Sequence, residues 1–285
     1  MVCTVAASIL STRAAADPLI SQTGFVENEG EQIYFEAVGQ GDAVVLCHGL
    51  GGNHAIWYQQ VPALAERFRV ITWDQRGFGR STNVHEKNSP AAAAEDLKAI
   101  LDHLDIDRAH LIGQSLGGWA VTGFTLKYPD RVRSLVLADT IGGIYTPEAS
   151  AHFDVYIRES MTSPPPDQQP INRHPAVGEQ LSIADPAKTF LYKQIGSVAP
   201  PAPKNAGLQL RQTSYPLDAV RKMNLPTLLV VGQNDPIFPP AVIRSVADEL
   251  PGASVAEVPN TGHSPYFESP DVWNSIVIAF LSQPN

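Results

Sequence analysis

The sequence is poor in cysteine and in basic residues, and it has no long apolar run. Only Cys3 and Cys47 are cysteines, which excludes a disulfide framework, and Cys47 ends an apolar run where a buried thiol is expected. Lysine and arginine total 20 against 29 acidic residues, a formal net charge of −9. Nucleic acid and anionic membranes both need clustered positive charge, so we expect neither as a partner and predict a neutral small-molecule substrate. No run reaches the roughly 18–20 apolar residues of a membrane span.

The first residues form the one ambiguous segment. Val2–Leu10 is apolar, but no basic residue precedes it, and Arg13 lies after it. A secretory signal carries its positive charge before the apolar stretch. We therefore predict a loosely ordered leader over residues 1–22 of a cytoplasmic protein, with secretion as the alternative.

Apolar runs and helical patterns alternate along the rest of the chain. A hairpin is expected from Gly24–Glu29 and Gln32–Val38, and buried strands from Ala43–Cys47, Val70–Trp73, His110–Gly113, Val132–Ala138, Thr227–Gly232 and Ser254–Val258. Helical patterns cover Ala91–Leu104, Ser115–Lys127, Pro240–Leu250 and Pro270–Leu281. Short apolar strands separated by helices are typical of a parallel sheet covered on both faces. The sequence predicts an α/β fold with a mostly parallel, doubly wound sheet.

This alternation is interrupted over residues 142–215, which contain Pro164-Pro165-Pro166 and short amphipathic pieces such as His152–Met161. A structureless loop of that length is uncommon in a compact domain. We predict a helical lid inserted at residues 142–215, between core segments 23–141 and 216–285. It would lie over the carboxyl edge of the sheet, where ligands bind in open α/β folds.

One short motif carries the candidate nucleophile. Gly113-Gln114-Ser115-Leu116-Gly117 has the pattern G-x-S-x-G, and it follows a predicted strand and opens a predicted helix. In that setting the glycines permit a tight turn, and the serine is presented at a helix N-terminus that favours negative charge. We predict that Ser115 is a catalytic nucleophile.

A serine hydroxyl needs a base, and the base needs an orienting acid. Asp235 follows the strand Thr227–Gly232, and His263 follows the strand Ser254–Val258, so both lie at the same sheet edge as Ser115. We predict His263 as general base and acid, with Asp235 orienting it. Asp139, which follows Val132–Ala138, is the alternative acid.

Oxyanion donors are expected from two backbone N–H groups, those of Leu50 and Leu116. Leu50 lies in the glycine-rich run His48-Gly49-Leu50-Gly51-Gly52. His48 is expected to brace this loop, and Asp74 and Arg76 are expected to pair and shape the turn that follows another strand.

Substrate contacts are harder to place. Candidates are Trp119, Ile141, Phe153, Tyr156 and Ile237, and apolar residues of the insertion (Phe153, Tyr156, Ile157, Met161, Phe190, Tyr192) serve either lid packing or substrate binding. Neither a cofactor nor a metal is predicted, and the sequence says nothing about oligomeric state.

Together these motifs resemble the α/β-hydrolase superfamily of serine hydrolases. The resemblance rests on the loop His48–Gly52, the turn Asp74–Ser81, the elbow Gly113–Gly118, Asp235 and His263, and it covers the chain outside the leader and the insertion. Within that superfamily the chain is similar to small esterases, to enol-lactonases and to cofactor-free haloperoxidase-like perhydrolases. The segment Phe124–Pro129 is also similar to hydrolases of carbon–carbon bonds, although Gln114 and Phe267 replace the Asn and Trp common there.

The resemblance implies cleavage of a small carboxylic ester or lactone through an acyl-enzyme. Three alternatives are carbon–carbon bond cleavage of a diketone ring-fission product, perhydrolase activity, and a ligand receptor built on a hydrolase scaffold.

Overall fold

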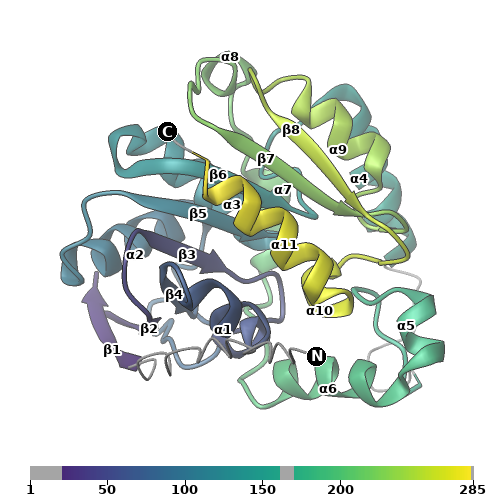
Figure 1. The fold of residues 1–285 in the computed structure, drawn as a ribbon, viewed down its shortest axis with the longest axis horizontal. Helices are drawn as coiled ribbons and strands as arrows, with labels where there is room; N and C mark the ends of the chain where they lie inside the picture. The colour runs from purple at the N-terminus through teal and green to yellow at the C-terminus, as the bar shows by residue number, and fades with distance from the viewer. Residues whose placement is uncertain (1–20, 161–169, 284–285) are drawn as a thin grey trace, which may run out of the picture.

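A computed structural model describes residues 21–160 and 170–283, so most of the predicted leader and Met161 lie outside the described residues. Eight strands form one sheet in the order β1-β2-β4-β3-β5-β6-β7-β8 (Figure 1). The strands are β1 (Ser21–Asn28), β2 (Glu31–Val38), β3 (Ala43–Cys47), β4 (Arg69–Trp73), β5 (Ala109–Gln114), β6 (Val132–Ala138), β7 (Thr227–Gly232) and β8 (Ser254–Val258).

The sheet is antiparallel at one end and parallel elsewhere. β1 pairs with β2, and β2 with β4, in antiparallel register. Every other neighbouring pair is parallel, from β4 across to β8. The predicted hairpin and mostly parallel sheet are therefore confirmed, and the carboxyl ends of β3 and β5 to β8 meet at one edge.

Side chains of the central strands alternate between two apolar layers. Val45 and Cys47 of β3 face one layer, whereas Val44 and Leu46 face the other. The first layer is completed by α2 (Pro90–His103), α3 (Leu116–Lys127) and α9 (Pro240–Ala247), and the second by α1 (Gln60–Ala65), α10 (Pro265–Glu268) and α11 (Pro270–Leu281). Figure 1 shows α11 crossing in front of the sheet. Helices on both faces of a parallel sheet define a doubly wound fold.

The described connections include the short 3₁₀ helices η1 (His54–Trp57) and η2 (Pro129–Arg131). Between β6 and β7 the chain forms α4 (Pro147–Ser160), α5 (Glu179–Ala184), α6 (Pro186–Ser197), α7 (Ala206–Gln212) and α8 (Leu217–Val220). We call residues 142–215 the insertion. Within the described ranges, no helix has the length and apolar character needed to cross a bilayer.

Candidate functional site

Ser115 lies in a strained turn between β5 and α3. Its φ of +48° and ψ of −118° are rare for a residue with a side chain. The turn is fixed on both sides, because the Ser115 N–H donates to Ala138 O (3.0 Å) and Thr140 Oγ1 donates to Ser115 O (2.7 Å). A Cβ at Gly117 would lie 2.4 Å from the carbonyl oxygen of Cys47, so only glycine allows this close approach. The serine is thereby held half-buried at the carboxyl edge of the sheet.

The loops after β7 and β8 bring Asp235 and His263 together. His263 Nδ1 lies 2.8 Å from Asp235 Oδ2, and both residues are buried. Asp235 Oδ1 accepts the N–H groups of Ile237 (2.7 Å) and Phe238 (3.1 Å), which is the environment of an ionised carboxylate. Nδ1–H then donates to Asp235, and Nε2 is left to accept a proton. His263 and Ser115 line the same cavity.

The glycine-rich loop after β3 packs directly on the elbow. A Cβ at Gly49 would lie 2.2 Å from Gln114 Oε1 and 3.0 Å from Ser115 Cβ. His48 braces the loop as expected, since Nδ1 donates to Gly49 O (2.8 Å) and Nε2 accepts from the Gln75 N–H (3.1 Å). Burial lowers the pKa of His48, which keeps this imidazole neutral.

The two residues predicted to supply oxyanion donors both lie near Ser115. Leu50 follows Gly49 and lines the cavity. Leu116 is the first residue of α3, where the N–H has no partner within the helix. Both N–H groups therefore belong to segments in contact with the Ser115 turn.

Gln114 is a site residue that sequence reasoning did not single out. Its Nε2 donates to the backbone oxygen of His263 (3.0 Å), and its Oε1 lies against Gly49. One side chain thus joins two loops. The first is the glycine-rich run His48–Gly52, called the oxyanion loop after its predicted role, and the second is the loop after β8 that carries His263, called the histidine loop. Its position beside Ser115 in the G-x-S-x-G motif is the sequence feature that could have indicated this role.

A cavity of about 180 Å³ opens above Ser115, between the core and the insertion. Four predicted substrate contacts line it, namely Trp119, Phe153, Tyr156 and Ile237. Ile141 does not, because its side chain is fully buried in the core, so that prediction is not supported. Tyr192 of α6, another candidate from the insertion, also lines it. The remaining walls include residues that periodicity could not have identified, since they lie in turns or short helices: His174, Pro175, Ala176, Gly207, Leu210 and Phe238. Of the other insertion candidates, Phe190 is exposed, while Met161 and the Ile157 side chain lie outside the described residues.

The cavity wall carries no cationic side chain among its described residues. His174 accepts the Ala176 N–H on Nδ1 (3.1 Å), and burial, with smaller effects of Lys193 and His263, lowers its pKa to about 4. The imidazole of His174 is therefore neutral near pH 7. Tyr192 Oη is already engaged by Ser264 Oγ (3.0 Å). The walls are thus largely apolar and uncharged.

Asp74 and Arg76 do not pair, which corrects the prediction for this turn. Asp74 accepts from the N–H of His54 (2.6 Å) and of Arg80 (2.8 Å), whereas the Arg76 guanidinium is bound by Asp96 (2.6 Å). Asp74 packs against Gly79, where a Cβ would lie 2.2 Å from its carboxylate, so its side chain is directed inward under the turn.

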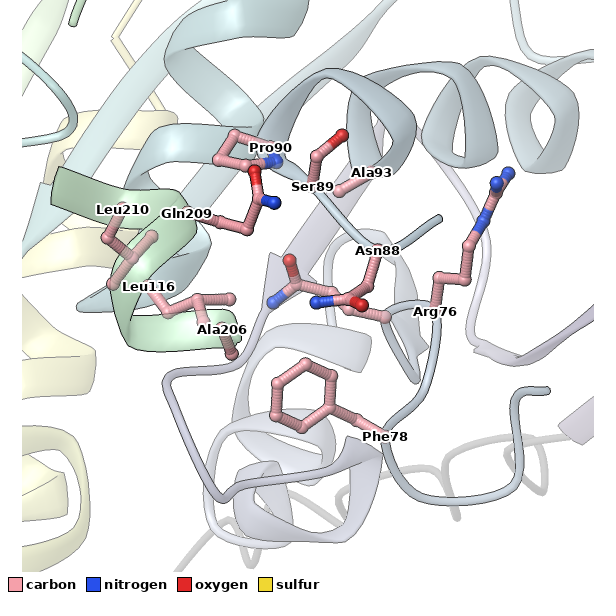
Figure 2. Close-up of a pocket in the computed structure, with 11 residues that line it drawn as sticks. Arg76, Phe78, Asn88, Ser89, Pro90, Ala93, Leu116, Ala206, Gln209 and Leu210 are labelled. Atoms are coloured by element: carbon pink, nitrogen blue, oxygen red, sulfur yellow. The ribbon is translucent and has the colours of Figure 1, made fainter. Parts of the chain in front are cut away.

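A second, smaller hollow of about 20 Å³ lies beside the start of α2 (Figure 2). In Figure 2 the Arg76 guanidinium points away from this hollow. Such a volume holds about one water molecule, so it is not a substrate site.

Asp139, Asp235 and His263 form a cluster in which one ligand atom of each lies within 4.8 Å of the others. These residue types could hold a metal ion. Here, however, Asp235 and the His263 Nδ1 atom are already paired with each other (2.8 Å), and Asp139 Oδ1 accepts the Gly232 N–H (2.8 Å). The cluster is therefore better described as two adjacent buried carboxyl groups beside a histidine.

The chain belongs to the α/β-hydrolase family. Residues 42–179 match the family model described as "alpha/beta hydrolase fold", and residues 204–285 match that described as "TAP-like protein". A pimeloyl-[acyl-carrier protein] methyl ester esterase of Aeromonas hydrophila is 31% identical over 86% of this chain and 98% of its own length.

Two solved structures are similarly close. A thermophilic esterase from Thermogutta terrifontis superposes with a TM-score of 0.78 and 29% identity, over 91% of this chain and 98% of that one. Est816, described as an N-acyl homoserine lactone degrading enzyme, has a TM-score of 0.74 and 29% identity, over 90% and 99%. Esterases and a lactone-degrading enzyme are thus among the relatives, and the chain is a hydrolase of this family.

Proposed function

We propose that the protein is a serine hydrolase that cleaves a small, uncharged carboxylic ester or lactone through an acyl-enzyme on Ser115. The single observation that supports this most is the shared cavity. The strained Ser115 and the Asp235-bound His263 both line it, at one edge of the sheet.

Each residue has a defined role in this proposal. His263 Nε2 removes the proton of Ser115 Oγ as the oxygen attacks the ester carbonyl, and later gives that proton to the leaving oxygen. Asp235 fixes the tautomer and stabilises the imidazolium. The N–H groups of Leu50 and Leu116 stabilise the tetrahedral oxyanion, and water then releases the acid in a second round.

The cavity also supports a class of substrate. Its walls are aromatic and aliphatic, with no lysine or arginine among the described lining residues. Burial of an unpaired carboxylate in such surroundings is costly. We therefore favour an uncharged acyl group over the anionic product of ring fission that a carbon–carbon bond hydrolase would bind.

The test is pre-steady-state hydrolysis of para-nitrophenyl butyrate. A burst of nitrophenolate equal to the enzyme concentration is expected, followed by slower turnover. Ser115→Ala should abolish the burst and lower kcat by roughly 10⁴-fold or more. Ser254→Ala, at an exposed position of β8, serves as the matched control and should behave like the wild type.

Three outcomes would count against the proposal. Equal rates for Ser115→Ala and the wild type would remove Ser115 from the mechanism. Turnover of a vinylogous diketone together with inactivity on esters would indicate carbon–carbon bond hydrolysis. Tight ligand binding without turnover, unchanged by Ser115→Ala, would indicate a receptor.

A further inference from the structure

Asp139 is a buried carboxyl group to which the proposed mechanism gives no role. It follows β6 with φ at +49°, and its side chain is fully inaccessible to solvent. Its N–H donates to Val230 O (2.8 Å), and its Oδ1 accepts the N–H of Gly232 (2.8 Å). Both partners belong to β7, so the residue is fixed against the strand that leads to Asp235.

The other oxygen of Asp139 is unusual. Oδ2 is buried and accepts no hydrogen bond from any described group. One oxygen of Asp139 nevertheless lies within 4.8 Å of both a carboxylate oxygen of Asp235 and a ring nitrogen of His263. An orphaned polar atom in such a place requires an explanation, because an unsatisfied buried oxygen is costly.

The two carboxyl groups differ in the hydrogen bonds that they accept. Asp235 accepts two backbone N–H groups and the imidazole N–H. Among the described residues, Asp139 accepts a single N–H, that of Gly232. The negative charge therefore belongs on Asp235, and two adjacent buried carboxylates cannot both be ionised at little cost.

The surroundings favour a neutral Asp139 further. Burial, and then the charge of Asp235, raise the pKa of Asp139 well above its usual range. Glu268 adds to this as a further negative group, and the other titratable neighbours are His263, Tyr192 and Tyr266. None of these neighbours is a lysine or arginine that could stabilise a second carboxylate.

We propose that Asp139 is a positioning residue: a neutral carboxylic acid whose Oδ2–H donates to Asp235 and holds the Asp235–His263 pair in place. The orphaned Oδ2 then has its partner. This role rests on the proposed function of Asp235 and His263. It differs from that of an alternative acid, because the imidazole N–H is bonded to Asp235.

The bond has a predictable effect on the chemistry. A hydrogen bond donated to Asp235 delocalises part of the negative charge of that carboxylate. Without the donor, the same carboxylate would favour the protonated imidazole more strongly, and His263 would lose its function as a base at a higher pH. Asp139→Asn retains an acceptor for Gly232 and an N–H donor for Asp235, whereas Asp139→Leu retains neither.

Infrared spectroscopy tests the protonation state without any need for turnover. The difference spectrum of wild type minus Asp139→Asn at neutral pH should contain the C=O stretch of a carboxylic acid. The matched control Asp107→Asn, at an exposed position, should leave that band in place. Absence of the band from the wild type would overturn the proposal, whether or not the protein proves to be an esterase.

The pH dependence of ester hydrolysis tests the positioning role. We expect Asp139→Asn to keep the wild-type profile of kcat against pH. Asp139→Leu should lower kcat about tenfold at unchanged KM, and the acidic limb of its pH profile should move to higher pH. A shift of the Asp139→Asn limb to lower pH by about one unit would mean that Asp139 is ionised, which overturns the proposal. An Asp139→Leu profile that superposes on the wild type would overturn it equally.

Discussion

Two glycine contacts set the geometry around Ser115 at the scale of single residues. Gly117 lets the start of α3 approach the carbonyl of Cys47, and Gly49 lets the oxyanion loop rest on Gln114 and Ser115. Gly117 belongs to the motif around Ser115, whereas Gly49 belongs to a separate glycine-rich run after β3 that the fold brings against that motif. The sequence predicted which residues meet, because strand ends share an edge.

Gly49→Ala should damage catalysis more than folding. The added methyl group would meet Gln114 Oε1 at 2.2 Å, so the loop must move away from Ser115 and carry the Leu50 N–H out of position. We expect kcat to fall by about 10²–10³-fold with a smaller change in KM, as for loss of an oxyanion donor. Steady-state kinetics on a para-nitrophenyl ester measures this.

Gly51→Ala is the matched control in the same loop. Unlike Gly49, it has a positive φ (+76°), so alanine there strains the backbone, but its methyl group would meet no atom within 4 Å. Equal losses of kcat in the two variants would show that any disturbance of this loop, and not the contact with Gln114 and Ser115, explains the effect.

At the scale of secondary structure, most elements could be predicted and their side-chain partners could not. β3, β6, β7 and β8 have the predicted bounds, because continuous apolar runs between turn residues leave little freedom. α9 ends at Ala247 rather than Leu250, an ordinary uncertainty at a helix end. The error at Asp74 and Arg76 arose because sequence proximity does not tell where two side chains point. Arg76 instead reaches Asp96 on α2.

Glu268 on α10 connects the insertion to the histidine loop. Its carboxylate accepts the N–H groups of Gly178, Gly262 and Ser264 at 3.0–3.2 Å. Glu268→Gln would place an amide NH₂ against these donors. We expect the free energy of unfolding to fall by about 2 kcal/mol and kcat/KM by about tenfold.

Urea unfolding and ester kinetics together test the Glu268 prediction. Glu66→Gln, at the exposed C-terminal end of α1, is the control. It should change neither the free energy of unfolding nor kcat/KM. A normal kcat/KM in a destabilised Glu268→Gln would mean that the contact stabilises the fold without orienting His263.

Glu31 at the start of β2 makes stability depend on pH. Burial alone would raise its pKa, but hydrogen bonds from Thr82 and from the His85 and Val84 backbone lower it to about 2. A lowered pKa means that the stabilisation is present above the unfolded value of 4.5 and is lost as the pH falls toward 2. We expect Glu31→Gln to cost about 2 kcal/mol at neutral pH and progressively less in acid.

Denaturant unfolding of the wild type and Glu31→Gln at several pH values from neutral to acid measures this difference. A difference that stays constant down to about pH 3 would show that the carboxylate charge is not its source.

At the scale of the whole molecule, the net charge and the cavity lining both disfavour an anionic substrate. The chain carries a net charge of −9, and the described cavity lining adds no cation to offset it. The net charge can be counted from the sequence, whereas the residues that line the cavity depend on how the insertion folds over the core. Substrate class was therefore the part of the function that sequence motifs specified least.

An anionic acyl group should be a poor substrate. We expect para-nitrophenyl butyrate to be preferred over the mono-para-nitrophenyl ester of glutaric acid by about a hundredfold or more in kcat/KM, because the free carboxylate loses its hydration without gaining a partner. Comparable values for the two esters would contradict an uncharged substrate.

Leu50→Lys tests the electrostatic origin of that preference. The Leu50 side chain is 52% exposed at the cavity, so a lysine there can remain hydrated while adding a positive charge near the entering substrate. We expect kcat/KM for the anionic ester to rise several-fold at low salt and this gain to fade as ionic strength increases, whereas Leu50→Met should show neither effect. A gain that is the same at low and high salt, or that also appears in Leu50→Met, would mean that shape and not charge limits entry. The preference for neutral esters would then have to be attributed to the aromatic walls formed by Trp119, Phe153 and Phe238.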